Sequence, residues 1–226
     1  MKPLTAVLFA AMTSIAVSAG GREAAAPLVV CCAGDSLIRP TPVHLRALAA
    51  REGPDLDIRE WAQGGLNSET YPSFFRRNKT LWRETACDAI LLQLGTNDAV
   101  PILEERTNPA EFRSRITAIL SEFKAFAGPA GRPPVLFLAT VPRFCERPET
   151  AARNRVVEEI LNPILREIAA AEGAVLVDNH AALSGRAEFY DPDCVHPNAE
   201  GEKALAENWL RALRLRFAPA KRPPGA

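Results

Sequence analysis

The chain has few of the residues that metal centres and nucleic-acid interfaces require. It contains only three histidines, and its 27 Lys+Arg balance its 27 Asp+Glu, so that the formal net charge is zero. A balanced chain without a stripe of basic and aromatic residues argues against a nucleic-acid-binding surface. With so few histidines, a centre that needs several imidazole ligands is also disfavoured.

Cysteines are few, odd in number and never spaced as CxxC, which argues against zinc ligation and against a dense disulfide framework. We expect Cys31 and Cys32, within an apolar run, to be buried small hydrophobic side chains. Cys145 and Cys194 follow predicted strands in loops, and an exported protein can bridge them. Such a bridge would hold the loop that carries His196, although no connectivity follows from sequence alone.

Only the start of the chain has a long hydrophobic run. Lys2 is followed by an apolar stretch, 4–17, that is too short to cross a bilayer, and Val17-Ser18-Ala19 is a small-residue cleavage pattern. Residues 1–19 are therefore predicted to be a signal peptide, with a buried N-terminal helix or a retained anchor as the alternatives. The expectation is a periplasmic or secreted protein without stable membrane insertion after cleavage.

The remaining sequence predicts one α/β domain over residues 27–218, followed by a flexible Pro-rich tail at 219–226. Short apolar runs, which indicate buried strands, alternate with segments of helical periodicity. The predicted strands are Leu28–Cys32, Leu56–Trp61, Ala89–Leu94, Val135–Thr140 and Ala174–Val177. Helices are expected at Ala110–Phe126, at Ala151–Ala171 with a kink at Pro163, and at Asn198–Phe217. This order predicts a three-layer α/β/α sandwich around a five-stranded parallel sheet, the flavodoxin-like arrangement.

Polar segments follow the first four predicted strands, where functional groups gather in parallel sheets. Gly34-Asp35-Ser36 follows the first strand and presents a hydroxyl that can act as a nucleophile. A serine that transfers acyl groups needs a base, a group that orients the base, and donors for the oxyanion. Of the histidines, His196 has the best context, because Asp193 precedes it by three residues; His180 could also reach this edge, whereas His44 lies on a helix that turns away.

Asn97 follows the third predicted strand in Gly95-Thr96-Asn97-Asp98. Its amide could donate to an oxyanion, although an asparagine at a strand end commonly bonds its own turn. The three segments resemble the SGNH hydrolase superfamily, the GDSL-type esterases and lipases. The resemblance rests on Gly34-Asp35-Ser36-Leu37, Gly95-Thr96-Asn97-Asp98 and Asp193-Cys194-Val195-His196, in that order.

The resemblance implies a role for each of these residues. Ser36 would be the nucleophile and its N–H an oxyanion donor, His196 the base, Asp193 its orienting carboxylate and Asn97 the side-chain donor. The family usually has a glycine whose N–H completes the oxyanion hole; here Ser68 occupies that position, in Gln63-Gly64-Gly65-Leu66-Asn67-Ser68-Glu69-Thr70. We expect Ser68 N–H to serve, with Gly65 as the fallback.

The expected function is hydrolysis of small-molecule carboxylic esters through an acyl-enzyme, with no metal or cofactor. Short acyl or acetyl esters are favoured, and acetylated carbohydrate or lipid remains open. The alternatives are an acyltransferase of the same fold and a non-catalytic carbohydrate- or lipid-binding module. A metallophosphoesterase built on Asp35, Asp98, Asp193 and His196 is disfavoured by the shortage of histidine ligands.

Overall fold

A computed structural model describes residues 26–52, 54–129 and 131–217. The predicted signal peptide and the tail at 219–226 lie outside these residues. The strands form one parallel sheet in the order β2-β1-β3-β4-β5. They are β1 (Leu28–Gly34), β2 (Leu56–Ala62), β3 (Ala89–Gln93), β4 (Val135–Ala139) and β5 (Val175–Val177). The predicted α/β fold with a five-stranded parallel sheet is confirmed, with strand ends within two residues of those expected.

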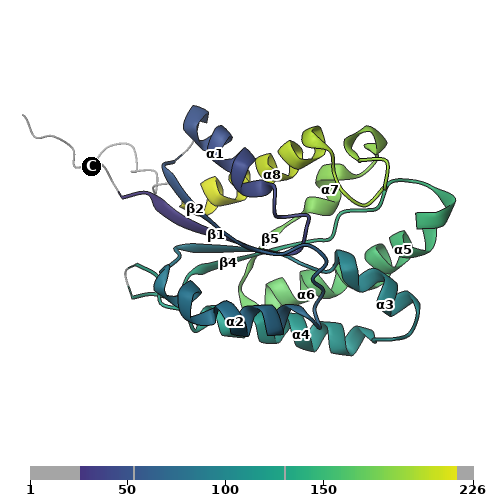
Figure 1. Cartoon of the computed structure of the whole chain (residues 1–226), viewed down its shortest axis with the longest axis horizontal. Coiled ribbons are helices and arrows are strands. Elements are labelled where there is room, and N and C mark those ends of the chain that lie inside the picture. The colour runs from purple at the N-terminus through teal and green to yellow at the C-terminus, as the bar shows by residue number, and fades with distance from the viewer. Residues whose placement is uncertain (1–25, 53, 130, 218–226) are drawn as a thin grey trace, which may run out of the picture.

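Helices cover both faces of the sheet (Figure 1). On one face lie α1, α7 and α8, and on the other lie α2, α4 and α6. Their bounds, with those of two shorter helices, are α1 (Thr41–Glu52), α2 (Tyr71–Glu84), α3 (Ala99–Leu103), α4 (Pro109–Lys124), α5 (Ala151–Val156), α6 (Asn162–Glu172), α7 (Asn179–Leu183) and α8 (Ala199–Phe217). The three layers follow from strands that are buried on both sides and so need a helix over each face.

Side chains of β1 alternate between two separate cores because successive residues of a strand point to opposite faces. Val30 and Cys32 pack with residues of α1 and α8. Cys31 and Ala33 pack with the aromatic residues of α2 and α4. In this second core Trp61 stacks on Trp82 with ring centroids 4.7 Å apart, so both are core residues.

The expectation for the strand cysteines is right for one of them and wrong for the other. Cys32 is a free buried thiol, and burial raises its pKa far above the ordinary value. Cys31 is equally buried but forms a disulfide with Cys87, which lies just before β3. The two cysteines are 56 residues apart, and the sequence analysis did not consider this pair.

The helix expected at Ala151–Ala171 is interrupted near Pro163, as predicted. It consists of α5, a π-helical turn at Val157–Leu161, and α6. Proline lacks the amide hydrogen that would continue the regular ladder, and π-helical turns often occur where a helix carries a functional residue. Asn162, directly before Pro163, points its amide to the backbone of Val141, accepting from the N–H at 2.7 Å and donating to the C=O at 3.0 Å.

At the carboxyl end of the sheet, β1 and β3 approach each other closely at Gly34. Gly34 pairs with Gln93, has φ +140°, and a Cβ built on it would lie 1.8 Å from the Gln93 carbonyl oxygen. No side chain fits there, and an L-residue disfavours that φ. Glycine is thus required at the point where the chain leaves β1.

Gly34→Ala is expected to destabilise the protein by several kcal/mol, because the methyl group collides with backbone rather than with a movable side chain. Gly173→Ala is the matched control: Gly173 also has positive φ (+66°), but a Cβ there meets nothing within 4 Å, so the cost should be about 1 kcal/mol. Urea unfolding of both variants measures the difference. Equal destabilisation would contradict the importance of this close approach.

Candidate active site

Ser36 lies in the tight turn that follows β1. Asp35 N–H donates to the Gln93 carbonyl at 3.1 Å, which continues the β1–β3 contact one residue beyond the strand. The Asp35 carboxylate then accepts the Leu37 N–H at 2.9 Å. These two bonds fix the backbone on either side of Ser36, whose own side chain is only half-buried.

His196 lies between Ser36 and Asp193. Its Nε2 is 2.9 Å from Ser36 Oγ, and its Nδ1 is 2.6 Å from Asp193 Oδ2. The other oxygen of Asp193 accepts the backbone N–H groups of Val195 and His196, both at 2.9 Å. The structure therefore brings together the three residues that the sequence selected, in the order that proton transfer from a serine requires.

Asp193 remains a carboxylate over a wide pH range. Partial desolvation raises the pKa of this carboxyl, but hydrogen bonds from the His196 ring and from the two amides outweigh it and hold the pKa at about 2. An ionised Asp193 keeps the Nδ1 proton of His196 in place, so that Nε2 is the acceptor that faces Ser36.

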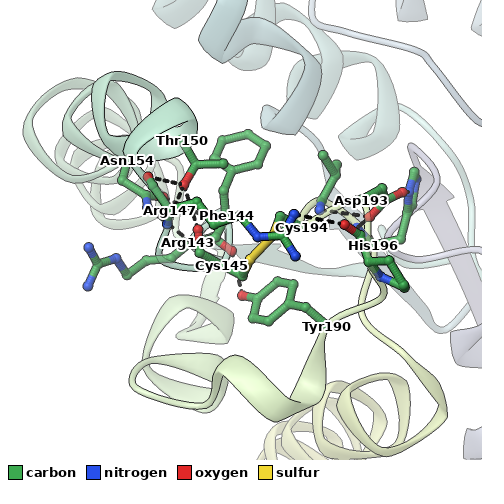
Figure 2. Close-up of a disulfide and its surroundings, with 12 residues drawn as sticks. Arg143, Phe144, Cys145, Arg147, Thr150, Asn154, Tyr190, Asp193, Cys194 and His196 are labelled. Atoms are coloured by element: carbon green, nitrogen blue, oxygen red, sulfur yellow. Dashed lines mark hydrogen bonds and ion pairs between the residues drawn. A yellow bond between two sulfur atoms is a disulfide. The ribbon is translucent and has the colours of Figure 1, made fainter.

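A disulfide between Cys145 and Cys194 fixes the loop that carries Asp193 and His196 (Figure 2). The two Cα atoms are 4.8 Å apart, and Cys145 N–H also donates to the Cys194 carbonyl at 3.0 Å. Two hydrogen bonds connect the same two segments. Arg147, in the segment after β4, donates to the Pro192 carbonyl at 3.1 Å, and the Tyr190 hydroxyl donates to the carbonyl of Arg143. The loop that carries Asp193 and His196 is thereby joined to the segment that follows β4.

That segment is itself fixed by an asparagine the sequence analysis overlooked. Asn154, buried in α5, accepts the Phe144 N–H at 2.8 Å and donates to the Phe144 carbonyl at 3.1 Å. Thr150 Oγ1 donates to the Cys145 carbonyl at 2.5 Å. The sequence did contain a signal for this role: Asn154 lies among the apolar positions of a predicted helix. A polar side chain buried there needs a hydrogen-bond partner.

Asn97 lies in the short helical turn Thr96–Asp98 after β3, as expected from the sequence. Its Nδ2 donates to the Leu66 carbonyl at 2.9 Å. Asn97 also lines a cavity of about 330 Å³ together with Gly65 and Val195. Val195 adjoins His196, and a Cβ built on Gly64 would lie 3.8 Å from Ser36 Cβ. Neither Ser36 nor His196 lines the cavity, but its wall contains Gly65 and Val195, which adjoin Gly64 and His196 in the chain.

Ser68 differs from the sequence expectation, in which its N–H faced the oxyanion. Its side chain is fully buried, and its N–H donates to both carboxylate oxygens of Asp98, at 3.0 and 3.1 Å. The Ser68 hydroxyl adds a third bond to the same carboxylate at 2.5 Å. The amide is thus directed at Asp98, whereas Gly65, the fallback residue, lines the same cavity as Asn97.

Two buried carboxyl groups, Asp35 and Asp98, lie behind the serine turn. Burial raises the pKa of Asp35 to about 7, with the bond from Leu37 N–H opposing this and the nearby Asp98 charge adding to it. Burial likewise raises the pKa of Asp98 to about 6, against the hydrogen bonds from Ser68. Both groups therefore change charge near neutral pH.

The other two histidines lie away from Ser36. His44 joins α1 to α8 through Glu202, with Nε2 and Oε2 3.1 Å apart. His180 Nε2 lies 3.5 Å from Glu158 Oε1. Within the described parts of the chain, no group of three or more His, Cys, Asp and Glu side chains is arranged to hold a metal ion. No helix of those parts is long and apolar enough to cross a membrane.

Comparisons with known proteins place the chain in a family and a fold class. The chain is 28% identical over 167 residues to an acetylxylan esterase of Xylanibacter ruminicola, across 66% of this chain and 33% of the relative. It thus spans about a third of that curated relative's length. A lipase/acylhydrolase from Enterococcus faecalis has a similar fold, with a TM-score of 0.68 and 20% identity over 86% of this chain and 100% of that one.

A catalytic mutant of an acetylxylan esterase from Geobacillus stearothermophilus also shares the fold, with a TM-score of 0.66 and 16% identity over 82% of this chain and 94% of that one. The family model of the GDSL-like lipases and acylhydrolases matches residues 32–204, from β1 into α8. The match includes every residue of the site. The chain belongs to the GDSL-like Lipase/Acylhydrolase family of SGNH-type ester hydrolases.

Proposed function

We propose that this ester hydrolase acts through Ser36, His196 and Asp193 and forms an acyl-enzyme on Ser36. The observation that carries the proposal is the position of His196, with Nε2 2.9 Å from Ser36 Oγ and Nδ1 2.6 Å from Asp193. His196 takes the hydroxyl proton as Ser36 attacks the ester carbonyl, and then gives it to the leaving alcohol. Water repeats the cycle and releases the acid.

The oxyanion would receive hydrogen bonds from Ser36 N–H, from the side chain of Asn97 and from the backbone at Gly65. Asn97 Nδ2 carries two hydrogens, so one can donate to the oxyanion while the other keeps its bond to the Leu66 carbonyl. Gly65 takes the place of Ser68 in this proposal because Ser68 N–H is occupied by Asp98. Donors fixed before the reaction stabilise developing charge without reorganisation.

Short acyl esters, with acetyl esters of carbohydrate foremost, are the substrates we propose. The relative from Xylanibacter ruminicola carries the name acetylxylan esterase, and this chain covers 33% of its length. A cavity of about 330 Å³ is at the small end of ligand sites and suits a small acyl group better than a long chain. We further propose that the protein works outside the cytoplasm, where its two disulfides persist.

Hydrolysis of 4-nitrophenyl esters from acetyl to long acyl chains tests the function. Turnover should be highest for short chains, vanish in Ser36→Ala, and fall about 10²–10³-fold in Asn97→Ala, the usual effect of losing one oxyanion donor. Absence of turnover on every ester by folded wild-type protein would favour the acyltransferase or the binding module. Turnover that survives in Ser36→Ala would refute the nucleophile.

Removing the Cys145–Cys194 disulfide should impair both stability and activity. A Cys145→Ser/Cys194→Ser variant is expected to lose about 2–4 kcal/mol of unfolding free energy, because the unfolded chain gains freedom. It should also lose roughly tenfold in kcat/KM, since small displacements of a catalytic group are costly. The matched control, Cys31→Ala/Cys87→Ala, removes the disulfide in the core and should lower stability alone. An equal loss of kcat/KM in both variants, measured while both are folded, would contradict a positioning role.

Asp35→Asn should change how stability depends on pH. The folded pKa of Asp35, about 7, lies above the unfolded value near 4. Between these values the folded protein retains a proton that the unfolded chain has released, so the unfolding free energy of the wild type falls as pH rises. Asparagine keeps the acceptor for Leu37 N–H and removes this titration. Urea unfolding from pH 4.5 to 7.5 should show the variant gaining stability relative to the wild type; parallel curves would exclude a protonated Asp35.

A further inference from the structure

The cavity beside Ser36 has a positively charged wall. Arg106 and Arg153 line it, and no Asp or Glu does; the remaining lining residues are Gly65, Asn67, Thr96, Asn97, Val100, Pro101, Phe144 and Val195. A neutral acyl group needs no guanidinium groups within its binding site. Two of them, without a carboxylate in the wall, indicate a negatively charged part of the ligand.

The two arginines differ in how much of their charge is available. Arg106 is exposed, and its Nε lies 2.7 Å from Glu104 Oε2. Arg153 is half-buried, and among the side chains that the structure describes it contacts the Phe144 ring and forms no ion pair. A guanidinium group is always charged. When it is partly buried and has no carboxylate beside it, an anion that binds there compensates the charge. Arg153 therefore carries the argument.

The contact that Arg153 does make leaves its donors free. Its Cζ lies 5.8 Å from the centre of the Phe144 ring. A guanidinium donates its N–H groups within its own plane, so contact with an aromatic ring does not consume these donors. Phe144 is itself fixed, because Asn154 bonds both its N–H and its C=O, and the neighbouring Cys145 is bridged to Cys194. Arg153 thus rests on a rigid surface.

We propose that this cavity selects esters that carry a carboxylate, with Arg153 binding the carboxylate while Ser36 attacks the ester. One unpaired guanidinium matches one carboxylate, which it can bind with two parallel hydrogen bonds. Two classes of ester carry such a carboxylate: monoesters of dicarboxylic acids have it on the acyl half, and acetylated uronic acids have it on the alcohol half. The inference rests on the proposed function and adds the substrate class to it.

Two pairs of esters test the proposal and separate the two halves. Monoethyl succinate is compared with ethyl 4-methylpentanoate, which replaces the acyl carboxylate by an isopropyl group of similar shape. 3-Acetoxybenzoate is compared with 3-acetoxybenzamide, which replaces a carboxylate on the alcohol half by a neutral amide. The measured quantity is the ratio of kcat/KM for the charged ester to that for its neutral partner, in low and high salt.

In the wild type, one of the two ratios is expected to exceed one and to fall with added salt, because salt screens a partly exposed charge pair. The pair that shows this identifies the half that carries the carboxylate. Arg153→Gln should lower the ratio about tenfold, as expected for loss of a charge-assisted hydrogen bond, and Arg153→Lys should restore part of it. Arg155→Gln is the matched control, since Arg155 is exposed on the same helix, and it should leave the ratio unchanged.

Ratios that are the same in the wild type and in Arg153→Gln overturn the inference while leaving ester hydrolysis intact. If no ester is hydrolysed, the proposed function fails, and calorimetry with Ser36→Ala tests the cavity separately. The uncleaved charged ester should then bind more tightly than its neutral partner, and the added substitution Arg153→Gln should abolish the difference. Equal binding of charged and neutral esters by Ser36→Ala overturns the inference as well.

Discussion

The close contact between β1 and β3 is the constraint on which the rest of the site depends. Because a side chain at Gly34 would collide with the Gln93 carbonyl, the two strands meet backbone to backbone and leave the sheet at the same place. Here the strand order changes direction, from β2-β1 on one side to β3-β4-β5 on the other. Helices leave to opposite faces at such a point and open a crevice. The turn with Ser36 and the turn with Asn97 begin on either side of it.

Asp193 and His196 do not follow a strand directly. They lie in the loop that precedes α8, and this loop brings them to the crevice. Local bonds give the loop its shape: one carboxylate oxygen of Asp193 holds two backbone amides and the other holds the His196 ring. The position of the loop is fixed by the disulfide to Cys145, whose neighbour Phe144 is in turn hydrogen-bonded by Asn154. In the same segment the ring of Phe144 contacts Arg153, so this segment supports both the loop that carries His196 and the cavity wall.

The sequence predicted those features that depend on local pattern. Apolar runs located the strands, and short motifs selected Ser36, Asn97, Asp193 and His196. It did not predict features that depend on partners distant in the chain. Ser68 was expected to face the oxyanion because of its place in a motif, yet Asp98, 30 residues later, binds its amide. Likewise Arg153 has an ordinary place in a helix, and only the folded structure brings it to a cavity without carboxylates.

The neighbouring cysteines of β1 have a consequence for how the protein matures. Cys31 and Cys32 of β1 point to opposite faces of the sheet, and only Cys31 can meet Cys87 in the native register. A shift of β1 by one residue would exchange the two faces and offer Cys87 the other thiol. Formation of the Cys31–Cys87 bridge therefore requires β1 to lie in its native register beside β3.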